Sequence, residues 1–190
     1  MTPLCHDVTV FCHPYEESGR QSHGLLYRAA ALYCGLSETE LGPLETASRG
    51  KPFFPHHPRL HFSISHSGSW WVCGFSSCPL GLDLQIHRTH VSPDKLSRRF
   101  FHPLEDAFLK EKDYIPFFDV WCAKESWVKY TGQGFYDPPE SFSVVSPDGH
   151  FPCMDAAALS LIPFQPDYSL CLCTSLPCNW SFCPLQQDSL

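Results

Sequence analysis

The chain has 190 residues, of which 43% are hydrophobic and 14% aromatic, enough to bury a core in one domain or two small lobes. Its formal net charge is −7, and proteins that bind duplex nucleic acid usually carry a basic face, so we expect no nucleic-acid partner. No apolar run has membrane-spanning length, and residues 1–7 lack the basic and apolar regions of a signal peptide. We therefore expect a cytoplasmic protein without a membrane partner.

The eleven cysteines do not suggest a disulfide framework, because their number is odd and no Cys-x-x-Cys pair occurs. The densest group lies near the end of the chain, at Cys171, Cys173, Cys178 and Cys183. Structural zinc sites use tighter, paired spacings. A free cysteine is more often a small buried hydrophobe, which is how we interpret these residues.

The first quarter of the chain predicts a strand and a helix. Residues 4–12 alternate in polarity and predict a strand that His13-Pro14 ends. Residues 18–34 have helical periodicity and stop at Gly35, with one apolar stripe formed by Leu25, Ala29, Leu32 and Tyr33. Residues 36–59 look irregular and contain the compact basic loop Gly50-Lys51-Pro52.

Residues 60–64 alternate and predict a half-buried strand that runs into a polar turn, Ser65-His66-Ser67-Gly68. Backbone amides, a hydroxyl and an imidazole at one turn suit phosphate oxygens. A plain hairpin turn is the alternative, because residues 70–75 predict the next strand. A hydrolase using Ser65 and His66 is disfavoured, since neighbours on a strand point to opposite faces and no G-x-S-x-G motif occurs.

Residues 80–86 predict a third strand, in which four aliphatic residues occupy one face. The other face carries Gly81, Asp83 and Gln85. Asp83 and Gln85 project side by side and could give two oxygen ligands to a hard cation such as Mg²⁺. A solvated polar strand face is the alternative interpretation.

The second half begins with a loop at residues 87–92, the expected lobe boundary. Ser92-Pro93 and Pro103 each predict a helix start. We expect strands at residues 142–145 and near 150–151, joined by the turn Pro147-Asp148-Gly149, and a last strand at 168–174. This order predicts an α+β fold with lobes at residues 1–90 and 91–175, and a poorly ordered tail at 176–190.

A helix over residues 116–131, ending at Gly132, carries the most concentrated charge. Glu125 and Lys129 lie four apart and share a face, and Lys124 precedes them between large aromatic rings. Taken alone, this is an ordinary amphipathic helix with a surface ion pair of small energetic value.

Four motifs in order make a more specific pattern: Gly50-Lys51-Pro52, Phe62–Ser67, Gly81–Leu84 and Trp121–Lys129. The ordered set resembles the signature of the 4′-phosphopantetheinyl transferases, in particular the surfactin-synthetase-activating type. The resemblance covers roughly residues 50–175. It implies a pseudo-dimeric fold of two similar lobes in one chain, with the ligand site between them.

The resemblance also implies a reaction. Coenzyme A and Mg²⁺ would bind between the lobes, a serine hydroxyl of an apo carrier protein would attack the β-phosphate, and 3′,5′-ADP would leave. Such transfer needs positioning and charge neutralisation more than covalent help. The carrier could belong to a peptide synthetase, a polyketide synthase or a fatty-acid synthase. Because the chain is acidic, we expect carrier recognition through an apolar patch, and a monomer is the simplest state.

The resemblance assigns roles to individual residues. Asp83 and Glu125 match the metal-binding acids, and Glu125 also matches the base toward the carrier serine. Lys129 and Lys124 match lysines near the pyrophosphate and pantetheine end. The coenzyme A contacts also include Arg28, Lys51, Ser65 and His66.

Two departures from the family pattern stand out. Gln85 occupies a position where many members carry glutamate, so we expect a weak or water-mediated metal ligand there. No Lys or Arg precedes Arg20, and we expect Arg20, His23 and Arg28 to share the 3′-phosphate. Both departures leave a non-catalytic module that binds coenzyme A or a nucleotide as the alternative.

Overall fold

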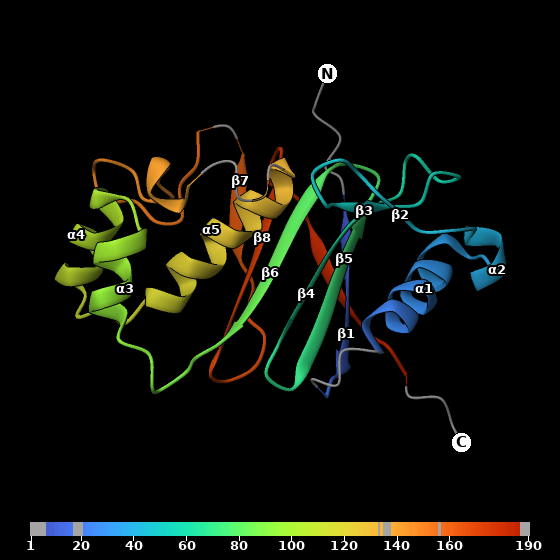
Figure 1. Ribbon diagram of the computed structural model, residues 1–190, viewed down its shortest axis with the longest axis horizontal. Coiled ribbons are helices and arrows are strands. Elements are labelled where there is room, and N and C mark those ends of the chain that lie inside the picture. Colours follow the sequence, from blue (N-terminus) through green and yellow to red (C-terminus); the bar gives the residue numbers. More distant parts are fainter. Residues whose placement is uncertain (1–6, 17–20, 133, 135–137, 156, 187–190) are drawn as a thin grey trace.

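The computed structural model describes residues 7–16, 21–132, 134, 138–155 and 157–186. Its layers follow one another along the longest axis as helices, a four-stranded sheet, a three-stranded sheet and helices again (Figure 1). This is a mixed α+β fold, as the sequence predicts. None of its described helices is both long and apolar enough to cross a membrane.

The first sheet has the strand order β4-β5-β1-β9. Its strands are β1 (Val8–Pro14), β4 (His61–Ser67), β5 (Trp70–Ser76) and β9 (Trp180–Pro184). One face is rich in aromatic side chains and is covered by α1 (Gln21–Cys34). Gly35 ends α1 with a φ of 66°, which confirms the predicted stop.

The buried stripe of α1 differs from the predicted one. Leu25, Leu26, Ala29 and Ala30 are buried in it, whereas Leu32 is 62% exposed. At about 100° per residue, Leu32 lies roughly a quarter turn from the centre of the stripe that the other four define. The prediction for Leu32 is therefore wrong.

The second sheet has the order β6-β8-β7. It comprises β6 (Leu80–Ile86), β7 (Ala158–Leu161) and β8 (Tyr168–Thr174). The leucines of β6 point toward the first sheet and share a buried cluster with Val8, Val10 and Val72. The opposite face of β6, which carries Gly81 and Asp83, packs against a helix.

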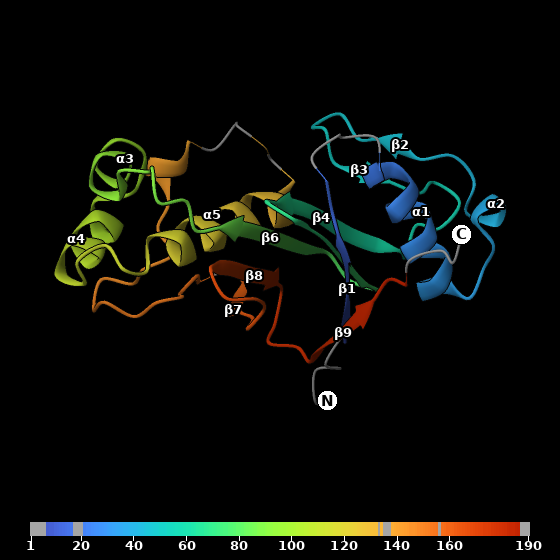
Figure 2. The same ribbon diagram turned by 90° about the horizontal axis from the view of Figure 1, so that it is seen from below.

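That helix is α5 (Phe117–Thr131), which lies along the outer face of the second sheet (Figure 2). It approaches β6 so closely that a Cβ atom at Gly81 would lie 1.9 Å from the carbonyl oxygen of Ser126. Beyond it lie α3 (Pro93–Phe100) and α4 (Pro103–Glu111). Ser92 and Pro103 begin these helices as predicted, and Gly132 ends α5 with a φ of 65°.

Several predicted boundaries are wrong. The segment 36–59 contains α2 (Glu38–Leu41), β2 (Glu45–Thr46) and β3 (Pro52–Phe53). Residues 142–145 and 150–151 form no strand, although Gly149 turns the chain with a φ of 83°. Pro139–Ser141 form a short 3₁₀ helix, η2. The tail contains β9, which pairs in parallel with β1, so a poorly ordered segment is the wrong description of Trp180–Pro184.

Candidate functional site

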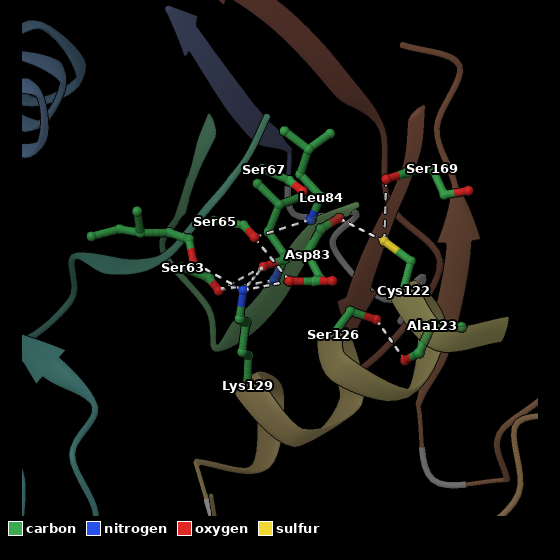
Figure 3. A network of polar contacts seen from close by, with 12 residues as sticks. Ser63, Ser65, Ser67, Asp83, Leu84, Cys122, Ala123, Ser126, Lys129 and Ser169 are labelled. Atoms are coloured by element: carbon green, nitrogen blue, oxygen red, sulfur yellow. Dashed lines mark hydrogen bonds and ion pairs between the residues drawn. The ribbon is translucent and has the colours of Figure 1, made fainter. Parts of the chain in front are cut away.

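A ladder of serine hydroxyls joins β4 to β6 where the edges of the two sheets meet (Figure 3). The backbone N–H groups of Leu82, Leu84 and Ile86 donate to Ser63 Oγ (2.9 Å), Ser65 Oγ (3.1 Å) and Ser67 Oγ (3.0 Å), respectively. Alternate residues of a strand share a face, so a serine at every second position of β4 can accept from the N–H group of every second residue of β6. We call Ser63, Ser65 and Ser67 the serine ladder.

The ladder corrects the predicted polar turn. Ser65, His66 and Ser67 lie inside β4 and pair with β5, and the chain turns only at Gly68. Ser65 is 6% exposed, whereas His66 is exposed and packs its ring 5.0 Å from that of Tyr15. The two side chains point to opposite faces, and this geometry does not support a hydrolase that uses both.

Asp83 is the acid at the centre of this region. Its Oδ1 atom accepts hydrogen bonds from Ser65 Oγ (2.8 Å) and from Lys129 Nζ (2.6 Å) (Figure 3). The Lys129 ammonium also donates to the carbonyl oxygens of Ile64 (3.1 Å) and Leu82 (3.2 Å). Within the described residues, Asp83 Oδ2 has no hydrogen bond or ion pair.

A hollow of about 400 Å³ lies beside Asp83, between β4, β6 and α5. Gln85, Glu125 and Lys129 also line it, together with Ser65, His66 and Trp121. Burial, and then the nearby charge of Asp83, raise the pKa of Glu125 above its ordinary value. The carboxylate of Glu125 contacts no hydrogen-bond donor or cation at bonding distance in the part of the chain that the structure describes.

Three oxygen-bearing side chains therefore line one hollow. The amide nitrogen of Gln85 donates to Ile86 O (3.4 Å), and this leaves its Oε1 atom available. Oxygen donors of this kind suit a hard cation such as Mg²⁺. Across the described residues, no cluster of three or more His, Cys, Asp or Glu side chains is arranged for a metal, and the set here is two acids and one amide.

A second hollow of about 250 Å³ adjoins the first, with Ile64 and Lys129 lining both. Gly50, Lys51 and Pro52 form one of its walls. The Lys51 ammonium donates to the carbonyl oxygens of Leu80 (3.0 Å) and Lys129 (2.8 Å). Lys51 therefore satisfies a carbonyl in the last turn of α5, and burial lowers the pKa of its ammonium.

Lys124 does not join this group. Its ammonium is buried, lies 2.8 Å from Glu105 Oε2, and donates to Phe142 O (2.8 Å). The ring of Phe142 lies 4.0 Å from the same ammonium. Glu105, which sequence reasoning passed over, is fully buried and also accepts from the backbone N–H of Val144 (2.8 Å). The predicted contact of Lys124 with coenzyme A finds no support in this geometry.

Arg28 lies on α1 and borders neither hollow. His23, also on α1, packs its ring 4.8 Å from that of Tyr27. Arg20 lies outside the described residues. The structure therefore does not bring Arg28 to the acids of the site.

Among the described cysteines, three are buried behind the site. The Cys122 thiol donates to the carbonyl oxygen of Asp83 (2.9 Å) and is fully buried on α5. Cys171 and Cys173 are buried on β8, and burial raises the pKa of Cys171 to about 12. The interpretation of Cys171 and Cys173 as core residues is confirmed.

Comparison with known proteins shows the family to which the chain belongs. The family model described as the 4′-phosphopantetheinyl transferase superfamily matches residues 79–187. A 4′-phosphopantetheinyl transferase of Bacillus subtilis is 36% identical over 169 residues, which are 80% of this chain and 71% of that protein. The 4′-phosphopantetheinyl transferase Sfp of Bacillus subtilis (strain 168) is 37% identical over 146 residues, 70% of this chain and 62% of that protein.

A further relative, 4′-phosphopantetheinyl transferase HetI of a Nostoc species, is 29% identical over 152 residues, which are 76% of this chain and 64% of that protein. The chain thus spans between 62% and 71% of the length of these three proteins. The matched residues include β6 and α5, the two elements that carry Asp83, Gln85 and Glu125. With its motifs in the expected order on these elements, the chain belongs to the 4′-phosphopantetheinyl transferase superfamily of transferase enzymes.

Proposed function

We propose that this protein transfers the 4′-phosphopantetheine arm of coenzyme A to a serine of an apo carrier protein and releases 3′,5′-ADP, with Mg²⁺ as cofactor. One observation carries the proposal: Asp83, Gln85 and Glu125 line one hollow, and Asp83 Oδ2, Gln85 Oε1 and the Glu125 carboxylate have no other partners among the described residues. Asp83 is paired with Lys129 through Oδ1 only, and its charge raises the pKa of the partly buried Glu125. A cation between Asp83 Oδ2 and the Glu125 carboxylate would offset that cost.

The residues of the hollow take separate roles in this proposal. Asp83, Gln85 and Glu125 would hold Mg²⁺, which supplies charge neutralisation to the phosphate groups when it is bound. Glu125 accepts the proton of the carrier serine as the hydroxyl attacks the β-phosphate. Lys129, which lines both hollows, offsets the negative charge that develops on the leaving phosphate.

Coenzyme A would extend across the two adjoining hollows. In this arrangement Gly50, Lys51 and Pro52 line one end, and His66 borders the other. Lys51 acts through the backbone and stem of its side chain, because its ammonium is bound to two carbonyl oxygens. Arg28 and Lys124 are not part of the proposed site.

We also propose a two-lobe organisation with the ligand site between the lobes and the boundary at residues 87–92. Residues 1–90 and 91–175 supply most of the two lobes. The support comes from the two sheets, each with its own helical cover, and from the serine ladder along their junction. In this division β6 crosses to the second lobe and β9 returns to the first.

The acceptor is proposed as a carrier protein of a peptide synthetase, a polyketide synthase or a fatty-acid synthase. A cytoplasmic monomer stays our expectation from the sequence. Incubation of the protein with apo carriers of each class, coenzyme A and Mg²⁺ tests the activity through the mass of the carrier. No mass gain on any carrier, together with measurable coenzyme A binding, would favour the non-catalytic binding module.

A further experiment tests the assignment of the metal ligands. At saturating Mg²⁺, Asp83→Ala should abolish transfer, whereas Gln85→Ala should only weaken it, because an amide contributes no charge to the site. Equal loss in the two variants would contradict the ranking of Asp83 above Gln85.

A further inference from the structure

We infer that Ser65 is a positioning residue for Asp83: its hydroxyl fixes one carboxylate oxygen so that the other is presented to the metal. This inference rests on the proposed metal site. It gives Ser65 a role different from the coenzyme A contact that the family resemblance implies.

The single proton of the Ser65 hydroxyl is committed within the protein. It accepts from the backbone N–H of Leu84 (3.1 Å) and donates to Asp83 Oδ1 (2.8 Å). Leu84 follows Asp83 on β6, so the hydroxyl is anchored to the strand whose carboxylate it orients. Because a hydroxyl has one proton to give, donation to Asp83 leaves none for a ligand.

Lys129 alone would hold Asp83 less rigidly. Its ammonium divides three donors among Asp83 Oδ1, Ile64 O and Leu82 O, and its side chain is 29% exposed. The Ser65 side chain, by contrast, is short and buried, and its hydroxyl proton changes direction only by rotation about one bond. Groups that hydrogen-bond to a metal ligand fix its orientation, and their loss typically weakens metal binding.

The serine ladder supplies a matched control within the same strand. Ser63 makes the same link to β6 by accepting from the Leu82 N–H (2.9 Å), and it is equally buried. Its own proton is directed to a backbone carbonyl oxygen, that of Leu82 (3.4 Å), and not to an acid. Loss of the Ser63 hydroxyl therefore removes one link between the sheets without touching Asp83.

Binding of Mn²⁺, followed by electron paramagnetic resonance of the free ion with and without coenzyme A, tests the inference. Ser65→Ala should bind Mn²⁺ at least about tenfold more weakly than wild type, the usual cost of losing such a supporting group. Without coenzyme A, Ser63→Ala should keep the wild-type affinity for Mn²⁺, and Ser65→Thr, which restores a hydroxyl, should recover it. Thermal unfolding should show similar losses for the two alanine variants.

Four outcomes would overturn the inference. The first is equal Mn²⁺ affinity for Ser65→Ala and Ser63→Ala, and the second is a Ser65→Thr variant no better than alanine. The third is weaker coenzyme A binding by Ser65→Ala in EDTA, which would make Ser65 a direct ligand contact. In the fourth, wild type binds no Mn²⁺, and the proposed metal site fails as well. If Ser65→Ala does not fold, Ser65→Cys removes the hydroxyl at similar volume and should show the same weaker binding.

Discussion

Asp83 and Glu125 are two acids at one hollow, and the charge of Asp83 makes ionisation of Glu125 more costly. The folded protein raises the pKa of Glu125 above its ordinary value of 4.5, through burial first and Asp83 second. It therefore holds this proton more tightly than the unfolded chain does. Stability is lost as pH rises from 4.5 through the pKa of the folded state.

The substitution Glu125→Gln removes this loss of stability at high pH, because an amide side chain does not ionise. In EDTA at pH 7, the variant should unfold at a higher temperature than wild type. The difference between the two unfolding temperatures should narrow toward pH 4, where residue 125 is neutral in both proteins. Circular dichroism during heating measures this, and Gln85→Glu, which adds a third acid, should shift the unfolding temperature the other way. A Glu125→Gln protein less stable than wild type at pH 7 without divalent cations would show that the acids do not repel.

At the residue scale, the sequence indicates which acids lie near one another but not which groups hold them in place. The strand period places Asp83 and Gln85 on one face, and the structure agrees. Lys124 is different: it precedes Glu125 directly, and consecutive helix residues diverge by about 100°, so both cannot face one hollow. The Ser65 hydroxyl could not be assigned to Asp83, because that contact depends on which strand edges meet.

At the scale of elements, α5 is positioned by its close approach to β6. A Cβ atom at Gly81 would lie 1.9 Å from Ser126 O and 2.4 Å from the backbone nitrogen of Tyr130, so the helix would have to move. We expect Gly81→Ala to cost about 3 kcal/mol of unfolding free energy or more, at the upper end for overpacking. Because α5 carries Glu125 and Lys129, the transfer activity of Gly81→Ala should fall together with its stability.

Urea unfolding measures the effect, and Gly24→Ala is the matched control. A Cβ atom at Gly24 meets nothing within 4 Å, and this glycine lies inside α1. Its replacement should be neutral or should stabilise by up to about 1 kcal/mol. Equal stability of the two variants would mean that the contact between α5 and β6 is looser than the structure has it.

The buried pair of Glu105 and Lys124 joins α4, α5 and the segment around Val144. Lys124→Met leaves the Glu105 carboxylate buried without its cation and should cost about 3–5 kcal/mol. The double variant Glu105→Gln/Lys124→Met removes both charges and should recover a large part of this loss. Urea unfolding of the two single variants and the double variant forms the required cycle.

The same double variant tests what Lys124 does for the ligand. Its affinity for coenzyme A, measured by calorimetry, should match that of wild type, because Lys124 lines neither hollow. A clear loss of affinity in this folded protein would return Lys124 to the site that the family resemblance implies.

Elements with local start and stop signals were predictable, and those without them were not. Ser92-Pro93, Pro103 and Gly132 mark helix ends through their own backbone preferences. The apolar run Phe142–Val145 has the composition of a strand, but the Val144 N–H donates to Glu105 and not to a neighbouring strand. That partner is 39 residues away in the chain, beyond the reach of a local pattern.

At the scale of the whole molecule, two strands belong to a sheet that their place in the sequence does not reveal. β6 directly follows the β4–β5 hairpin, yet it pairs with β8. β9, near the end of the chain, pairs in parallel with β1, near its beginning. Composition indicates which segments are extended, but the pairing depends on contacts between distant segments, so the strand content of each sheet could not be predicted from the sequence.

The end of the chain therefore stabilises the first sheet, and Leu185 gives the sharpest test. Leu185 is 3% exposed, packs in the aromatic core under α1, and its backbone N–H donates to Cys12 O (2.9 Å). Leu185→Ala should lower the unfolding free energy in urea by about 2–5 kcal/mol, as for other buried leucines. Leu176, which is 50% exposed in the same tail, is the control, and Leu176→Ala should stay within about 0.5 kcal/mol of wild type. If both variants matched wild type, residues 176–186 would behave as the poorly ordered tail that composition suggests, and β1 would be an open edge of the sheet.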